Sequence, residues 1–395
     1  MKNLFVEEAR ARILAGIGAP ATEMVALETA IGRVLAEPVL AVRDQPPFDA
    51  SAMDGWAVAG DGETFDIVGE SAAGHGYGRP LTPGQAVRIF TGAPVPAGAT
   101  RVVIQEVATR DGERLGTPPA DQRPRHIRPA GGDFHAGEVL LRAGVRLDPW
   151  RLSLAAAAGR AALSLAARPQ VVLLSTGEEI IPAGGAPTPD QIFDSGGPTL
   201  EALIAGWGGQ VRRLAAVGDN ADAIADALGE AGGELIVTLG GASVGDHDLV
   251  KPALARLGLE LSVETIRVRP GKPTWFGRLA DGRRVLGLPG NPASAMVCAE
   301  LFLRPLLNAL QGAEPGPRMA TARLAAPLAA NDGREHWARA RSEIREGALF
   351  VTPMDNQDSS LVTVFAEADA LLRRPIDAPA AQAGDLVDIL PLDRL

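Results

Sequence analysis

The chain has 395 residues, of which 46% are hydrophobic, so it exceeds what one core usually supports and we expect several folded domains. Its formal net charge of -10 at pH 7 argues against a general nucleic-acid binder, which needs a positive surface for phosphates. No export signal is evident and no apolar window approaches the length of a membrane span, so we expect a cytoplasmic protein without a membrane segment.

The first part of the chain predicts a docking helix followed by a connecting segment. Residues 4–17 place apolar side chains at helical spacing, with acidic residues early and basic residues late, as the helix dipole favours. We therefore expect residues 1–20 to form an N-terminal helix that docks on the α/β domain. Residues 25–36 have a second helical pattern, and Pro38 then forces extended chain. A connecting domain is expected over residues 21–45.

Residues 46–142 predict a small β domain inserted within the connecting domain. This part is rich in Gly and Pro, and short apolar runs recur at 65–68, 86–89, 102–107 and 139–141. A polar loop at 51–57 and turns at 91–96 and 131–138 separate these runs. An Ala-rich helical pattern at 152–166 then returns the chain, so residues 143–168 complete the connecting domain.

The next part alternates between strand and helix patterns. Continuous apolar strands between amphipathic helices predict a parallel sheet covered on both faces, which makes residues 169–312 a three-layer α/β domain. Residues 318–395 return to short strands with turns and predict a C-terminal β domain. The expected fold class is therefore a multidomain α/β plus β protein, and ligands should bind outside the carboxyl ends of the parallel strands.

Three Gly-rich corners follow expected strands of the α/β domain, at 175–177, 240–245 and 288–292. In the last of them Pro292 occupies a plausible first helical position, which leaves backbone N–H groups free to face an anion. A single corner of this kind is usually a simple chain reversal. Three such corners in one segment favour a phosphate-binding site.

Acidic residues stand beside these corners and suggest a metal. They are Glu178, Glu179, Asp194, Asp219, Asp246 and Asp248. Each acid alone is as readily a helix cap or a dipole partner. Together they would repel a bare phosphate, whereas a bound Mg²⁺ takes oxygen ligands and bridges carboxylate to phosphate. We therefore expect a ligand whose phosphate is bridged by magnesium.

A cationic segment follows at 266–274, where Arg267, Arg269 and Lys272 lie between two prolines. The alternative to an anion site is a solvated strand edge whose charges deter pairing. We favour an anion site, because the prolines fix the backbone there. The five histidines and the single cysteine lack metal-ligand spacing, and no Ser, His and acid set is evident. Zinc, redox and nucleophilic chemistry are therefore disfavoured.

Taken together, these motifs resemble those of the MoeA-type molybdopterin molybdenumtransferase family, which includes the E domain of gephyrin. The resemblance spans nearly the whole chain in the same order. It rests on the stretches at 51–57, 91–94, 175–179, 240–248, 270–273 and 287–292. A Gly-Gly-x-Ser-x-Gly corner also suits the related molybdopterin adenylyltransferases. The Ser-Ala-Met-Asp-Gly loop and the inserted β domain point to the molybdenum-inserting member.

The resemblance implies a homodimer of elongated subunits, with a cleft between the α/β domain of one subunit and the β domain of the other. Members take adenylylated molybdopterin and molybdate, use Mg²⁺ and release AMP. The molybdopterin adenylyltransferase and cofactor-accepting enzymes are further expected partners. Two alternatives stay open: a non-catalytic pterin-binding carrier or scaffold, and a molybdopterin adenylyltransferase.

The resemblance also assigns roles to individual residues of this chain. The catalytic set implied is Asp54, Thr91, Asp133, Glu179, Asp219 and Asp248, of which Glu179, Asp219 and Asp248 would hold the metal. The substrate-binding set implied is Gly240, Gly241, Ser243, Arg269, Lys272, Pro289, Gly290, Asn291, Pro292, Arg339 and Ser359. Arg269 and Lys272 would bind phosphate or molybdate, while Arg339 and Ser359 would approach the cleft from the C-terminal domain.

Three positions depart from the family pattern. Trp56 replaces the usual Tyr, which keeps an aromatic ring but moves its polar group. Gly196 stands where the family generally has Asn, so a side-chain amide is lost. Thr363 follows Leu361 and Val362 where Leu-Ser-Ser is typical, so a hydroxyl is lost.

Overall fold

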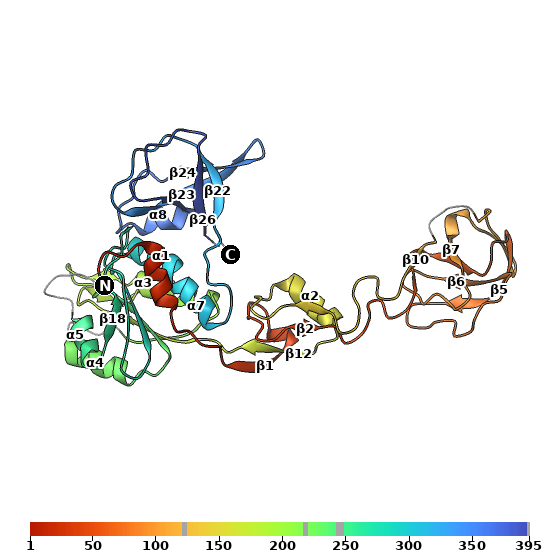
Figure 1. Cartoon of the computed structure of the whole chain (residues 1–395), viewed down its shortest axis with the longest axis horizontal. Helices are drawn as coiled ribbons and strands as arrows, with labels where there is room; N and C mark the ends of the chain where they lie inside the picture. Colours follow the sequence, from red (N-terminus) through yellow and green to blue (C-terminus); the bar gives the residue numbers. More distant parts are fainter. Residues whose placement is uncertain (121–124, 216–219, 242–248, 393–395) are drawn as a thin grey trace.

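The fold is that of a computed structural model, which describes residues 1–120, 125–215, 220–241 and 249–392. Figure 1 shows an elongated molecule with the α/β domain and the C-terminal β domain together at one end. The connecting domain lies in the middle, and the inserted β domain lies at the opposite end. The predicted multidomain α/β plus β architecture is therefore confirmed.

The α/β domain is built on a six-stranded sheet. Its strand order is β16 (Gln210–Arg213), β13 (Gln170–Ser175), β17 (Leu235–Leu239), β21 (Arg284–Leu288), β20 (Trp275–Arg278) and β18 (Glu260–Val263). The first four strands are parallel, as predicted, whereas β20 and β18 pair antiparallel. The carboxyl ends of β13, β17 and β21 therefore meet at one edge.

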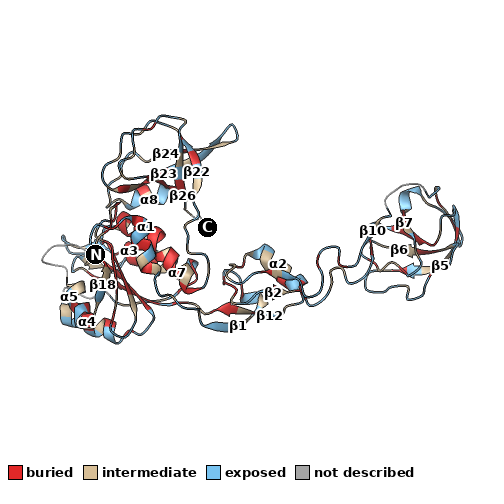
Figure 2. Ribbon diagram, viewed as in Figure 1, coloured by how far each residue is buried: buried red, intermediate tan, exposed pale blue. Residues whose placement is uncertain are grey.

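Helices cover both faces of this sheet, because its strands are apolar on both sides. Val171 and Leu173 of β13 point into one core with α1 (Val6–Leu14) and α3 (Gly196–Gly206). Val172 and Leu174 point into the other core, with α4 (Ala221–Gly229) and α5 (Val250–Ala255). In Figure 2 buried residues gather where α1, α3 and α7 pack together. The three-layer arrangement is confirmed.

The longest helix runs Pro292–Leu310 and consists of α6 (Pro292–Cys298), a π-helical turn (Ala299–Leu303) and α7 (Arg304–Leu310). By length and composition alone it could cross a membrane, so the prediction that no apolar window approaches that length was wrong. However, 83% of its apolar window is buried inside the structure. Its composition is explained by packing in the core of the α/β domain.

The connecting domain corrects two helix predictions. Residues 25–36 contain the end of strand β1 (Thr22–Ala26) and a 3₁₀ turn (Leu27–Thr29), not a helix. Helix α2 (Pro149–Ala157) ends before Gly159, which adopts a φ of 83°, and strand β12 (Ala162–Ala166) follows. β1 and β12 pair antiparallel, so each strand is stabilised by a partner distant in sequence. β2 (Val39–Leu40) pairs with β11 (Val139–Leu141) and completes this domain.

The inserted β domain contains a six-stranded sheet and a short strand pair. The sheet order is β7 (Arg101–Ile104), β4 (Gly55–Val58), β6 (Gln85–Ile89), β5 (Thr64–Ser71), β9 (Arg114–Gly116) and β8 (Thr109–Asp111). β3 (Ala50–Ser51) pairs with β10 (Ile127–Arg128) and precedes the loop that carries Asp54. Both faces of the sheet bury apolar side chains.

The C-terminal domain is a β structure that shares a strand with the α/β domain. Its order is β19 (Val268–Arg269), β23 (Glu335–Arg345), β24 (Ala348–Pro353), β22 (Ala320–Leu324), β26 (Leu386–Pro391) and β25 (Ala370–Arg374), and β23 also pairs with β25. A short helix, α8 (Val362–Glu367), packs against β23 and α6. Because β19 pairs with β23, Arg269 is carried into this domain.

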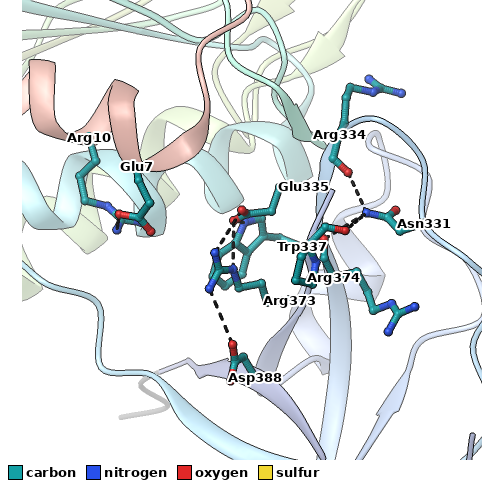
Figure 3. A network of polar contacts seen from close by, with 10 residues as sticks. Glu7, Arg10, Asn331, Arg334, Glu335, Trp337, Arg373, Arg374 and Asp388 are labelled. Carbon is teal, nitrogen blue, oxygen red and sulfur yellow. Dashed lines mark hydrogen bonds and ion pairs between the residues drawn. The ribbon is translucent and has the colours of Figure 1, made fainter. Parts of the chain in front are cut away.

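Buried apolar contacts attach the C-terminal domain to the α/β domain, and a polar network stabilises the C-terminal domain itself. Trp337 and Leu371 belong to the same apolar core as α1 and α3. Figure 3 shows Arg373 donating to Glu335 and pairing with Asp388, while Trp337 Nε1 donates to Glu335 at 2.9 Å. The C-terminal domain is therefore held against the α/β domain by a continuous core.

Candidate functional site

A pocket of about 700 Å³ lies at the carboxyl edge of the parallel strands, where ligands were expected. Its wall includes all three Gly-rich corners. The predicted site residues that line it are Glu179, Gly240, Gly241, Pro289, Gly290, Asn291 and Pro292. Apolar side chains complete the wall, among them Phe193 and Val250.

The three corners pack backbone against backbone, and at Gly240 this contact requires glycine. Thr176 N donates to Leu239 O at 3.0 Å, and Gly240 N donates to Leu288 O at 3.2 Å. Gly240 has a φ of 91°, and a Cβ there would lie 2.7 Å from Thr176 O. A Cβ on Gly290 would lie 3.5 Å from Gly240 Cα. Chain reversals that meet this closely form one surface of backbone groups around the pocket.

A buried hydroxyl beside these corners lacks a partner. Ser175 lines the pocket and is 2% exposed, and its Oγ makes no hydrogen bond within the part of the chain that the structure describes. Buried polar atoms are almost always paired, so this hydroxyl suits an oxygen of a bound ligand.

The two acids near the first corner differ in what they contact. Glu179 lines the pocket, and its carboxylate folds over Gly177, where a Cβ would lie 2.7 Å from Glu179 Oε2. Asp194 also lines the pocket, but it accepts from Gly197 N at 2.7 Å and from Arg213 Nη2 at 2.7 Å. Glu179 is therefore available to a ligand, whereas Asp194 anchors the start of α3.

The predicted metal site is only partly described. Asp219, Ser243 and Asp248 lie outside the described residues, so Glu179 is the one predicted metal ligand with a described position. Over residues 1–120, 125–215, 220–241 and 249–392, no group of three His, Cys, Asp or Glu side chains could hold a metal ion.

The departure at Gly196 has a steric explanation. A Cβ on Gly196 would lie 2.4 Å from Leu239 Cδ2, and both residues line the pocket. The leucine methyl group therefore occupies space that any larger side chain at position 196 would need.

The C-terminal domain reaches the pocket through the loop before α8. Asn291 Nδ2 donates to Ser359 Oγ at 3.0 Å, and Ala293 N donates to Ser359 O at 3.1 Å. Ser360 and Val362 line the pocket directly. The structure thus brings two predicted site residues, Asn291 and Ser359, into contact at the start of the long helix.

Two arginine side chains, Arg269 and Arg339, form a positively charged cluster next to this loop. Arg339 is fully buried, and its Nη2 donates to Asp358 O at 3.1 Å, while Nε and Nη1 have no hydrogen-bond partner among the described residues. Arg269 contacts Asp332 at 3.0 Å and His336 Nδ1 at 3.2 Å. Burial, followed by the charges of Arg269 and Arg339, lowers the pKa of His336 to about 4. The imidazole is therefore neutral at pH 7.

The predicted cationic segment is split between two surroundings. Arg267 donates to Gly333 O, and Arg269 joins the cluster around His336. Lys272 lines a separate pocket of about 390 Å³ with Arg267 and Arg334. Lys272, Arg269 and Arg339 are absent from the wall of the 700 Å³ pocket as described.

The inserted β domain holds a second group of predicted residues. Asp54 Oδ1 accepts from both the amide and the hydroxyl of Thr91, each at 2.8 Å. These two bonds, with a smaller contribution from Arg88, hold the pKa of Asp54 below its ordinary value. Asp133 is exposed on a turn and donates its amide to Gln45 O at 2.9 Å. Figure 1 places this domain at the opposite end of the molecule from the α/β domain, whose residues form most of the pocket wall.

One residue beside Asp54 was missed by sequence reasoning. Arg88 lies on β6, stacks on Trp56 and Phe90, and donates to Gly55 O at 3.0 Å. An arginine within a strand carries no motif, so only the fold places it there.

Comparisons with known proteins find matches along nearly the full length of this chain. The chain matches family models for the MoeA N-terminal region (domain I and II) at residues 4–159, a probable molybdopterin binding domain at 172–309, and the MoeA C-terminal region (domain IV) at 321–392. A molybdopterin molybdenumtransferase of Haemophilus influenzae is 32% identical over 99% of both chains. One from Nostoc sp. is 31% identical over 94% of this chain and 89% of the relative. A crystal structure of the molybdopterin biosynthesis MoeA protein of Pyrococcus horikoshii has a TM-score of 0.83, with 25% identity, and covers 98% of this chain and 99% of that chain.

Proposed function

Because the chain belongs to the molybdopterin molybdenumtransferase family, enzymes of molybdenum cofactor biosynthesis, we propose that it transfers molybdate onto adenylylated molybdopterin and releases AMP. The observation that carries this proposal is the meeting of three Gly-rich corners around a buried hydroxyl that has no partner among the described residues. The reaction would depend on Mg²⁺ and take place in the cytoplasm.

The pterin nucleotide would bind in the 700 Å³ pocket with its phosphates against the corners. Ser175 Oγ and the backbone N–H groups around Gly240 and Gly290 offer donors, and the helix Pro292–Leu310 directs its positive end at the same place. Gly241, Ser243 and Asn291 belong to the same corners. Phe193 and Val250 supply an apolar wall for a flat ring.

The metal would be held by Glu179 together with Asp219 and Asp248. Glu179 already points into the pocket, and a set of carboxylate oxygens is the kind of donor that Mg²⁺ prefers. When bound, Mg²⁺ neutralises the charge of the phosphates. Glu179 is exposed in the pocket, so its side chain is accessible to a bound metal ion.

Molybdate would bind at the cationic cluster. Arg339 presents two buried N–H groups without partners, and the Nε of Arg269 is also unpartnered within the described part of the chain. Buried guanidinium donors of this kind match a tetrahedral oxyanion. Asp358 O accepts from Arg339, and the next residue, Ser359, contacts Asn291 in the pocket, so the cluster and the pocket are adjacent. Lys272 would add positive charge from the neighbouring pocket.

Asp54, Thr91 and Asp133 would act from the β domain of a second subunit. In one chain these residues lie at the far end from the pocket, so a complete site needs a homodimer. The connecting domain supports this, because it carries exposed apolar side chains such as Trp150 and Met24, which are 84% and 70% exposed. The adenylyltransferase and the enzymes that accept the cofactor would be further partners.

Reconstitution tests the proposal. Purified protein, adenylylated molybdopterin, molybdate and Mg²⁺ should release AMP and yield metal-loaded cofactor, and no AMP above a protein-free control would contradict it. Tight pterin binding without AMP release would favour a carrier. Consumption of ATP with molybdopterin would favour an adenylyltransferase.

A further inference from the structure

Arg88 is held in a clamp of aromatic rings directly beside Asp54. Its guanidinium lies 5.5 Å from the ring centroid of Trp56 and 4.8 Å from that of Phe90. These distances are within the range of favourable cation–π contact. The clamp fixes the plane of the guanidinium, so its N–H groups can hold neighbouring backbone in one geometry.

The same guanidinium braces the backbone at Asp54 and Gly55. Nη1 donates to Gly55 O at 3.0 Å, and Nη2 donates to Gln105 Oε1 at 2.7 Å. Gln105 N in turn donates to Asp54 O at 3.1 Å, which closes a ring of contacts around the aspartate backbone. Gly55 is pressed against β7, since a Cβ there would lie 1.9 Å from Val103 O. The backbone that carries Asp54 therefore has little freedom.

We propose that Arg88, clamped by Trp56 and Phe90, is a positioning residue that orients the Asp54 carboxylate for molybdenum transfer. This inference rests on the proposed function, in which Asp54 acts in the site. Thr91 donates two hydrogen bonds to Asp54 Oδ1. With Oδ1 held, the contacts of Arg88 with the neighbouring backbone determine where Oδ2 points.

The clamp also explains why Trp56 is compatible with this position. Trp is the best aromatic partner for a cation, and here the indole contacts Arg110 at 5.7 Å as well as Arg88. Among the residues that the structure describes, Arg88 on β6 is the charged group that acts on Asp54 and also contacts the backbone next to it. Arg110 on β8 contacts the other member of the clamp, Trp56.

The chain offers a matched control in the same domain. Arg101 also lies over an aromatic ring, 5.9 Å from that of Phe65, and donates to the backbone carbonyls of Gly60 and Gly62. Arg101→Gln therefore removes the same kinds of contact as Arg88→Gln without touching the brace on Asp54. Arg88→Lys keeps the charge but loses the planar guanidinium and its two hydrogen bonds.

The experiment follows the Asp54 carboxyl by ¹³C NMR in the full-length protein, with the signal assigned from an Asp54→Asn variant, and measures AMP release against pH. Arg88→Gln should raise the pKa of Asp54, move the acid limb of kcat/KM to higher pH and lower kcat/KM by roughly 10–100-fold. Arg88→Lys should recover part of the pH profile, and Arg101→Gln should match wild type.

Equal pKa values for Asp54 in the Arg88→Gln and Arg101→Gln proteins would overturn the inference. Should Arg88→Gln fail to fold, Trp56→Leu tests the same clamp and should raise the Asp54 pKa, with an unchanged value overturning it. Absence of AMP release by wild type would contradict the proposed function, while the NMR titration would still decide the role of Arg88.

Discussion

The hydrogen bonds from Thr91 to Asp54 predict a specific pH dependence. Because the Thr91 amide and then its hydroxyl lower the pKa of Asp54, the carboxylate is present above its ordinary pKa of 3.8 and is lost only as pH falls through the lower folded value. Thr91→Val removes one donor, so the acid loss of activity should move to higher pH.

Asp54→Asn, which removes the charge but keeps the shape, should lower turnover by roughly 10²–10⁴-fold with an unchanged melting temperature. The measurement is AMP release from pH 8 down to below the ordinary pKa of 3.8, with melting curves as the folding control. Full activity of Asp54→Asn would show that this carboxylate has no role in the reaction.

His336 reports on the proposed oxyanion cluster. Its folded pKa of about 4 lies below the ordinary 6.5, so between these values the unfolded chain binds more protons than the folded chain. The free energy of unfolding should therefore fall as pH drops from 6.5 towards 4. An oxyanion beside Arg269 and Arg339 would favour the imidazolium, so molybdate should raise the His336 pKa.

NMR titration of the histidines with and without molybdate checks this prediction. Exposed His75, in the inserted β domain, is an internal control that should not respond. Sodium chloride of equal ionic strength separates specific binding from screening. A His336 pKa that molybdate leaves unchanged would place the oxyanion elsewhere.

At the scale of elements, the packed corners predict how glycine substitutions differ. Gly240→Ala forces a Cβ to 2.7 Å from Thr176 O at a φ of 91°, so it should destabilise the fold by about 1–3 kcal/mol and abolish binding of the pterin nucleotide. Gly184→Ala has a similar φ of 88° with no atom within 4 Å of the new Cβ. It should cost about 1 kcal/mol and keep binding. Thermal melts and calorimetric titration with the pterin nucleotide compare the two variants. Equal losses of binding would contradict the claim that the close contact between Gly240 and Thr176 shapes the pocket.

Elements fixed by local pattern were predictable, whereas those fixed by distant partners were not. The apolar strand β17 and the long helix starting at Pro292 carry strong local signals, since continuous apolar strands were predicted for this domain and Pro292 was predicted at a first helical position. The segment around Leu27 looked helical, but β1 pairs with β12, and Leu27 N donates to Ala161 O. Tertiary pairing overrides weak helix propensity in such a segment.

Whole-molecule arrangement was predictable in part. The order of domains and the pocket at the carboxyl edge follow from sequence patterns and from the family resemblance. The position of Arg269 does not, because only the pairing of β19 with β23 carries that side chain into the C-terminal domain. Arg88 was missed for the same reason, since its neighbours come from separate strands and loops.

The central claim is that each reaction site combines the pocket of one chain with the β domain of another. In Figure 1 the connecting domain lies between the inserted β domain, which contains Asp54, and the α/β domain, which contains Glu179. A heterodimer of one Asp54→Asn chain and one Glu179→Gln chain would then have one intact site and one site with both defects.

Purified heterodimer, obtained by co-expression with two different tags, tests this claim most directly through its AMP release. Each variant homodimer should be inactive, and the heterodimer should recover about half of the wild-type rate. A heterodimer as inactive as the two homodimers would contradict a site shared between chains.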